Sequence, residues 1–488
     1  MDRDEISLVK IATIQQSNAN NEKNNKDKQQ KEMERQILRK MDFRLIPLLA
    51  LLYLMSFLDR VNIGNAKLAN LEADLGLHGA QYNWALSIFF FGYISIEIPS
   101  NIILMKTKPS LWIPFIMFLW GGITALMSLV KNFTELMVTR FFLGLAEGGL
   151  FPGVVFYLTL WYRRSEQNFR ISLFFAASGA AGAFGGLIAY AIMKMHGVGG
   201  LAGWQWIFIL EGLSTIVIAF AAFFWITDYA RSARWLTQEE REFAEKRLKE
   251  DAGVAYIPHF DKRHLKAAFQ DWKIYLAMVM SVNTGMEAYS FTLFLPVIIK
   301  GLGFERALSQ LLTVPPYVLA AIVTVFVAVH SDKTGYRGPY IVVSAAVGII
   351  GYIMMIFLKS VTGKYIASMI IAMGLFPCIG TGITWITNNL AGDAKRAIGA
   401  ALLTMSANIG GIFAGQIYRA NDAPHYTMGH TISGVSLLGV LITAVIFEVL
   451  LKRVNRLKVH DPERFTRNLS EDEIKNLGDW HPGFYYTL

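Results

Sequence analysis

The chain has little of what holds a water-soluble protein together. Only one of its 488 residues is a cysteine, Cys378, which excludes an internal disulfide. Charged residues make up 17% of the chain, whereas 53% of the residues are hydrophobic and the mean hydropathy is +0.38. Water-soluble domains carry a larger share of charge. The composition therefore predicts an integral membrane protein stabilised by helix packing.

Motifs of catalysis are missing as well. We find no cluster with metal-ligand spacing, no phosphate-binding loop and no paired nucleophile and base, so we expect neither an enzyme nor a bound cofactor. A pore-lining repeat is also missing, which argues against a channel. The first 44 residues are polar and the first apolar stretch is long enough to span a bilayer, so we expect no cleavable signal peptide.

Apolar stretches of about 20 residues, which match the roughly 30 Å hydrocarbon core of a bilayer, recur along the chain. Twelve are found, at 45–66, 82–104, 111–130, 135–160, 170–193, 204–227, 274–299, 308–330, 340–358, 365–390, 397–418 and 430–451. A long polar interval divides them into two groups of six. The predicted fold is all-α, with twelve transmembrane helices in two pseudo-symmetric six-helix bundles, at 45–227 and 274–451.

Three polar segments complete the organisation. The N-terminal tail, 1–44, has few apolar side chains to bury in its middle, so we expect it to be disordered. In the linker, 228–272, Thr237 precedes Glu240 by three residues, which is the pattern of a capping box at the start of a charged, amphipathic surface helix. We interpret this helix as a bridge between the halves, with a regulatory or partner-binding role as the alternative. The C-terminal tail is 452–488.

The basic residues are unevenly placed between the two sides of the membrane. Thirty-six of the 46 Lys and Arg residues lie in the tails and in the loops on the same side as the tails, and eight lie in the opposite loops. Positively charged loops stay in the cytoplasm during insertion. We therefore expect both termini to be cytoplasmic, and the net charge of +9 then needs no nucleic acid.

Two adjacent charges interrupt the first span. Asp59 and Arg60 cost several kcal/mol in a membrane unless they have partners, and neighbours on a helix point about 100° apart, so each needs its own. Partners are available on one stripe of the fourth span, formed by Arg140, Gly144, Glu147, Gly148 and Phe151. We expect an Asp59–Arg140 ion pair that leaves Arg60 and Glu147 facing a central cavity. The alternative is a fixed network of all four charges that locks the helices.

Further polar residues within the spans are candidates for the same cavity. We expect Tyr53, Glu287, Trp385, Asn388 and Asn408 to contact a substrate. An outer-gate role is the alternative for Glu287, and helix packing is the alternative for Trp385, Asn388 and Asn408. Trp385 offers a flat surface for a ring. Glu97, which lies deeper in the second span and is followed closely by Pro99, is expected to act in structure or gating.

Several of these segments match known motifs. The loop HSDKTGYRG, with Asp332, Lys333, Gly335 and Arg337, resembles the cytoplasmic loop of the major facilitator superfamily. Four segments resemble signatures of its anion:cation symporter branch: Asp59 to Gly64, Tyr93 to Asn101, Arg140 to Glu147, and Trp161 to Arg164. The C-terminal LGDWHP, 477–482, is similar to that of fungal permeases for allantoate, nicotinate and pantothenate.

This resemblance implies roles for residues already singled out. It implies that Arg60 binds a substrate carboxylate, that Asp59 and Glu147 couple transport to protons, and that Arg140 modulates both acids. It also implies that Asp332, Lys333 and Arg337 clasp helix ends on the cytoplasmic side.

We therefore predict a proton symporter for a small organic monocarboxylate, nicotinate being the first guess, that works by alternating access as a monomer in the plasma membrane. An uncoupled facilitator or exchanger, and a nutrient-sensing receptor of the same fold, are the alternatives.

Overall fold

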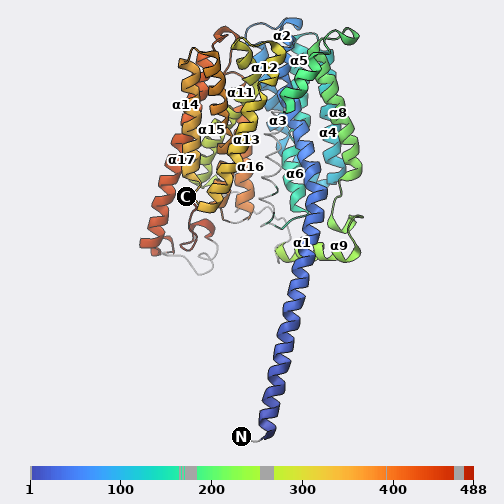
Figure 1. Ribbon diagram of the computed structural model, residues 1–488, viewed down its shortest axis with the longest axis vertical. Helices are drawn as coiled ribbons and strands as arrows, with labels where there is room; N and C mark the ends of the chain where they lie inside the picture. Colours follow the sequence, from blue (N-terminus) through green and yellow to red (C-terminus); the bar gives the residue numbers. More distant parts are fainter. Residues whose placement is uncertain are drawn as a thin grey trace.

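The chain folds as an all-α, multi-span protein in a computed structural model (Figure 1). The structure describes residues 3–163, 166, 170, 184–252, 269–391, 393–466 and 477–488. Its N-terminal half contains α1 (Arg3–Leu68), α2 (Leu71–Asp74), α3 (Gln81–Lys106), α4 (Pro109–Leu126), α5 (Phe133–Glu147), α6 (Leu150–Thr159) and α8 (Gly203–Trp225). The linker contains α9 (Gln238–Ala252). The C-terminal half contains α11 (Trp272–Gly301), α12 (Arg306–Leu311), α13 (Val314–Thr334), α14 (Gly338–Phe357), α15 (Val361–Asn388), α16 (Asp393–Ala414), α17 (Thr427–His460) and α18 (Glu463–Thr466).

The predicted spans agree with the observed helices. Within the described ranges, ten helices are long and apolar enough to cross a membrane. Shorter apolar helices at Phe184–Met193 and Ile398–Ala414 lie where the fifth and eleventh spans are predicted. Most of the predicted fifth span falls outside the described residues.

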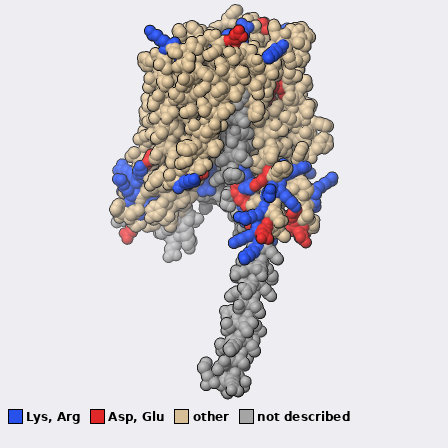
Figure 2. Space-filling model, viewed as in Figure 1, with Lys and Arg blue, Asp and Glu red and all other residues tan. Residues whose placement is uncertain are grey.

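Charge separates the two ends of the molecule from its middle. Figure 2 shows a broad uncharged band, with Lys, Arg, Asp and Glu gathered below it around α9 and the lower end of α17. Both chain termini and α9 lie toward this lower end, which we call the linker end; the opposite end is the far end (Figure 1). The capping box of α9 is confirmed, because Glu240 N donates to Thr237 Oγ1 at 3.3 Å and Thr237 N donates to Glu240 Oε2 at 3.0 Å.

The helices of each half pack closely, and the two halves meet along two helix pairs, α1 with α11 and α3 with α16. Glycines allow the tightest approaches. A Cβ on Gly144 of α5 would lie 2.0 Å from the Phe89 carbonyl oxygen of α3, and one on Gly285 of α11 would lie 2.2 Å from the Ala407 carbonyl oxygen of α16. Only glycine lets these backbones touch.

Hydrogen bonds close the gap between the halves toward the far end. The Asn83 side chain on α3 donates to the carbonyl oxygens of Gly415 and Tyr418, at 2.5 and 2.9 Å. Ser87 Oγ donates to the Ile412 carbonyl oxygen at 2.7 Å and accepts from Gln416 Nε2 at 3.0 Å. We call these six residues the far-end seal. Because they join α3 to α16 and the loop after it, the structure is closed at the far end.

The N-terminal tail differs from the expected disorder. α1 begins at Arg3, and Ile37 and Met41, one turn apart, are fully buried. Ion pairs hold the same stretch, since Glu34 pairs with Arg163 at 2.8 Å and Asp42 with Arg170 at 2.6 Å. The polar composition of the tail concealed these few apolar side chains, which are enough to dock the residues just before the first span.

The C-terminal segment folds back under the C-terminal half. Asp479 pairs with Lys273 at the start of α11 and with Lys395 of α16, the latter at 2.7 Å. The last residues bind the helix ends, because Thr487 O accepts from Trp385 Nε1 and Asn389 Nδ2, both at 2.9 Å. Burial alone would raise the pKa of the Asp479 carboxyl, but the two ammonium groups lower it below its ordinary value.

Replacing Asp479 with Asn should destabilise the protein. The change removes one of the carboxylates that neutralise the buried ammonium groups of Lys273 and Lys395. We expect the free energy of unfolding to fall by about 3 kcal/mol. We expect a lower thermal unfolding midpoint in detergent, while Asp461→Asn, at an exposed position nearby, leaves it unchanged. Since the folded-state pKa of Asp479 is depressed, its contribution exists above the ordinary Asp range and is lost as pH falls. The difference in unfolding midpoint between the wild type and Asp479→Asn should therefore become smaller in acid. A difference that stays constant with pH would contradict the ion pairs of Asp479.

Candidate functional site

A chain of polar contacts crosses the centre of the molecule from one half to the other. Arg60 on α1 donates to Glu147 Oε1, the last residue of α5, through Nη2 and through Nε at 3.2 Å. Its Nη1 donates to the Tyr289 hydroxyl on α11 at 2.9 Å, and this hydroxyl donates to Asn408 Oδ1 on α16 at 3.0 Å. Ser56 Oγ also donates to Glu147 Oε1, at 2.6 Å. Arg60 therefore touches both halves at once.

Aromatic rings surround the Arg60 guanidinium. Its Cζ lies 4.9 Å from the ring centroid of Tyr93, 5.3 Å from that of Phe89 and 5.7 Å from that of Tyr289. Phe90 packs on Tyr289 with the ring centroids 4.6 Å apart. Such rings attract the cation and exclude water, which strengthens its hold on an anion.

Two more predicted residues, Glu97 and Tyr53, lie around this centre. Glu97 on α3 interacts with Arg60 and Asn408. Tyr53 on α1 interacts with Arg60 and Tyr289, and its ring packs against Phe151 at 6.4 Å. We call Tyr53, Arg60, Glu97, Glu147, Tyr289 and Asn408 the central site.

The expected Asp59–Arg140 ion pair is wrong. Asp59 Oδ2 accepts from Trp120 Nε1 and Thr215 Oγ1, both at 3.0 Å. Arg140 Nε donates to the Ala85 carbonyl oxygen at 3.3 Å. Depth along the two helices suggested the pair, but the faces of α1 and α5 are rotated so that Glu147 meets Arg60, while Asp59 points toward α4 and α8.

The sequence reading missed Glu211. It lies on α8, is 4% exposed, and interacts with Asp59. Neither of its carboxyl oxygens has a hydrogen-bond partner in the part of the chain that the structure describes. The signal was present, since Glu211 is an acid inside the sixth apolar span, and such residues are usually functional.

Three predicted substrate residues lie away from the central site. Trp385 is fully buried against Phe447, with the ring centroids 4.8 Å apart, and its Nε1 donates to the C-terminal segment, so in this structure it does not contact the central site. Asn388 is the last residue of α15, at the linker end. Glu287 is fully buried inside the C-terminal half, where it accepts from the Tyr352 hydroxyl. The rotation of each helix about its own axis decides where these three side chains lie, and the sequence does not specify that rotation.

The loop between α13 and α14 lies at the linker end, as its motif predicts. Arg337 pairs with Asp332 at 2.7 Å, and its backbone N–H donates to the Leu488 carbonyl oxygen at 2.5 Å. Lys333 is exposed. The loop thus contacts the end of the chain, which the motif did not suggest.

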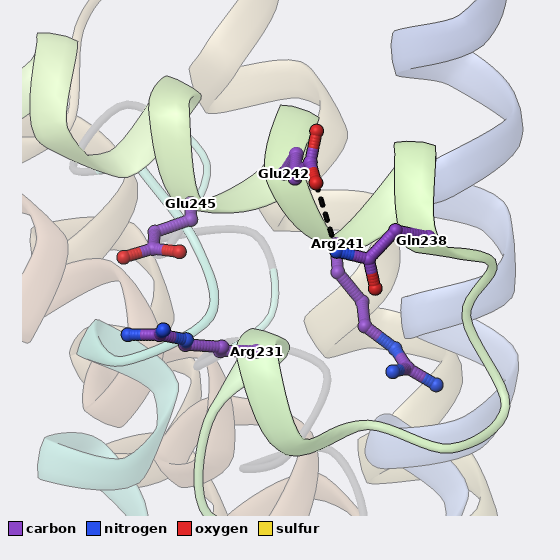
Figure 3. Close-up of a pocket in the computed structure, with 5 residues that line it drawn as sticks. All are labelled: Arg231, Gln238, Arg241, Glu242 and Glu245. Atoms are coloured by element: carbon purple, nitrogen blue, oxygen red, sulfur yellow. Dashed lines mark hydrogen bonds between the residues drawn. The ribbon is translucent and has the colours of Figure 1, made fainter.

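A polar hollow of about 290 Å³ lies beside α9 (Figure 3). Arg231, Gln238, Arg241, Glu242 and Glu245 line it, and Gln238 Nε2 donates to Glu242 Oε1 at 2.8 Å. It carries side chains of both signs and belongs to the linker outside the uncharged band. The central site therefore remains the candidate functional site. The described residues contain no group of His, Cys, Asp and Glu that could hold a metal ion.

Arg60 pairs with Glu147 inside the N-terminal half and contacts Tyr289 of the C-terminal half, and buried charges within apolar helices are typical of transport proteins. The sequence profile of the Major Facilitator Superfamily matches residues 49–415, and the chain belongs to this family. It is not an enzyme.

Relatives and solved structures agree with this membership. An uncharacterised transporter of Schizosaccharomyces pombe is 40% identical, over 93% of this chain and 90% of its own. A high-affinity nicotinic acid transporter of Saccharomyces cerevisiae is 32% identical, over 93% of this chain and 85% of its own. A crystal structure of a D-xylose-proton symporter superposes with a TM-score of 0.64 at 14% identity, covering 83% of this chain and 97% of its own. An inward-facing bacterial homologue of the lysosomal transporter Spinster gives 0.63 at 16% identity, covering 83% and 96%.

Proposed function

We propose that this protein is a proton symporter of the anion:cation branch that takes up a small organic monocarboxylate, nicotinate first among them. The Arg60–Glu147 pair carries the proposal. A guanidinium binds a carboxylate through two neighbouring N–H donors, and Nε and Nη2 of Arg60 now both donate to Glu147 Oε1. A substrate carboxylate therefore competes with Glu147 for Arg60.

Protonation of Glu147 resolves this competition. A neutral carboxylic acid holds the guanidinium far less tightly than a carboxylate, so Arg60 becomes available to the substrate. The proton and the anion then favour each other's binding, which is the thermodynamic requirement for symport. Asp59, modulated by Arg140, is the second candidate for a coupling proton, and Glu97 for gating.

The aromatic side chains around Arg60 support a substrate with a flat ring. We propose that Phe89, Tyr93 and Tyr289 offer the flat surface for a ring that the sequence analysis expected from Trp385. The similarity to a nicotinic acid transporter supports an aromatic monocarboxylate. We further propose that the linker end is cytoplasmic, that 1–44, 228–272 and 452–488 lie on that side, and that the protein acts as a monomer in the plasma membrane.

Alternating access follows from the far-end seal. The seal closes the outer end in this structure, so transport requires a second state in which α3 and α16 separate and the central site opens outward. Asp332, Lys333 and Arg337 are placed to hold the helix ends of the opposite side in that state.

Uptake of a matched pair of solutes tests the proposal. Cells expressing the protein should accumulate radiolabelled nicotinate faster at mildly acidic than at neutral external pH, and a protonophore should abolish the accumulation. Nicotinamide has the same ring but no charge, and we expect no uptake of it. Pantothenate and allantoate are the next candidates. Equal transport of nicotinate and nicotinamide would contradict the carboxylate site. Uptake without accumulation would favour an uncoupled facilitator, and binding without uptake a receptor.

A further inference from the structure

A second buried carboxyl group lies inside the C-terminal half, beside the central site but facing away from it. Glu287 on α11 is fully buried, and Tyr289, two residues on, contacts Arg60. Residues two apart on a helix point to nearly opposite sides. α11 therefore presents Tyr289 to the interface between the halves and Glu287 to the interior of its own half.

Among the described residues, Glu287 has the hydroxyl neighbours Tyr352 and Ser433 and no cation beside it. Its Oε1 accepts from the Tyr352 hydroxyl on α14, and its Oε2 has no hydrogen-bond partner in the described ranges. The other titratable groups around it are Tyr418, after α16, and His430 on α17. A carboxylate buried without a cation costs several kcal/mol, so this packing suits the neutral acid.

The surroundings of Glu287 continue to the far-end seal. The Tyr418 hydroxyl lies 3.1 Å from His430 Nδ1 and accepts from Ser433 Oγ at 3.4 Å. Ser433 Oγ in turn lies 3.5 Å from Ser290 Oγ on α11. We call Glu287, Ser290, Tyr352, Tyr418, His430 and Ser433 the Glu287 cluster; all six are at most 4% exposed.

Tyr418 belongs to both the far-end seal and the Glu287 cluster. Its backbone carbonyl accepts from Asn83 of the N-terminal half at 2.9 Å, while its ring and hydroxyl lie in the Glu287 cluster. The outer charges near it are Asp422, which interacts with Tyr418, and Lys364, which interacts with His430. A change in charge at Glu287 thus reaches the seal through directly contacting side chains.

We propose that Glu287 is a second proton-binding site and that its proton closes the far-end seal. The proton adds to the unpartnered Oε2, and the carboxylate becomes a neutral acid that the dry cluster accommodates. When the proton leaves, the carboxylate needs water, which enters from the far end as Tyr418 and Asn83 separate. The inference rests on the proposed symport and adds to it a proton that controls closure rather than substrate binding.

Cysteine labelling of the seal tests this directly. Cys378→Ser gives a chain free of cysteine, because Cys378 is the only one. Ser87→Cys then places a thiol in the seal, where Ser87 is fully buried. A membrane-impermeant maleimide added outside reacts only when the seal opens. Glu147→Gln is added so that titration of the central site does not contribute.

Because a maleimide reacts with the thiolate, whose fraction falls with pH, each labelling rate is divided by the rate of the same reagent with free glutathione at that pH. We expect this corrected rate to fall about fivefold or more between neutral and mildly acidic external pH, as the closed state is populated. Adding Glu287→Gln, a permanently neutral isostere, should give slow labelling at every pH, and Glu287→Asp should restore the pH dependence. An unchanged pH profile in the Glu287→Gln chain would overturn the proposal.

A further variant keeps the test decisive if Glu287→Gln does not fold. Tyr418→Phe keeps the ring and removes the hydroxyl that contacts His430, and we expect it to reduce the pH effect at least by about half. A full pH effect would count against the proposal.

Uptake measurements separate this inference from the proposed symport. A Glu287-dependent labelling profile without proton-driven uptake would refute the symport alone, and proton-driven uptake with a Glu287-independent profile would refute this inference alone.

Discussion

Replacement of Arg60 by alanine is expected to abolish substrate binding. Arg60 is 4% exposed, and it is the guanidinium that joins Glu147 of one half to Tyr289 of the other. A hydrogen bond to a charged group contributes about 1.5–3 kcal/mol, so loss of two should weaken the binding of a carboxylate by about 100-fold or more. Equilibrium binding of radiolabelled nicotinate to purified protein measures this.

Arg60→Lys provides the matched control. It keeps the positive charge and loses the planar fork, so we expect intermediate affinity. Both variants should elute as the wild type does in size-exclusion chromatography. Affinity within threefold of the wild type in Arg60→Ala would show that the anion binds elsewhere in the protein.

Replacement of Glu147 by glutamine is expected to separate exchange from accumulation. Glutamine has the shape of the protonated acid and releases Arg60 permanently, so substrate should still bind and cross. Because no proton is then taken up at this position, pH-driven accumulation should disappear, while counterflow exchange of labelled for unlabelled substrate continues. Both are measured in proteoliposomes with an imposed pH gradient.

Ser56→Ala is a graded comparison for the same carboxylate. It removes the 2.6 Å hydrogen bond to Glu147 Oε1 and leaves the carboxyl group in place. We expect it to keep accumulation and to alter only its pH profile. Full proton-driven accumulation by Glu147→Gln would show that Glu147 is not the coupling acid and would turn attention to Asp59 and Glu211.

Much of the architecture could be predicted because it depends on local properties of the chain. The lengths of the apolar stretches specify the spans, and the placement of Lys and Arg predicts their orientation. The same reasoning isolated Arg60 and Glu147, since ionisable residues in apolar spans are rare. It failed for the N-terminal tail, where the burial of Ile37 and Met41 depends on contacts with the bundle.

The partners of the buried charges could not be predicted in this way. Asp59 and Arg60 were correctly expected to need separate partners, yet Asp59 bonds to Trp120 and Thr215, and Arg140 bonds to a backbone oxygen. Trp385 lies under the C-terminal segment, about 100 residues further along the chain. Each outcome depends on which face a helix turns to its neighbours.

By itself, the sequence determined that this protein is an all-helical, multi-span membrane protein and which charged residues lie within its apolar helices. These properties follow from hydrophobic length and from the cost of burying charge, which act along one helix at a time. Only the tertiary structure decided that Arg60 meets Glu147 and that Glu287 faces the interior of the C-terminal half. Rotating a helix about its axis by less than the roughly 100° between neighbouring residues exchanges such partners. The close backbone contacts at glycines such as Gly144 and Gly285 set that rotation.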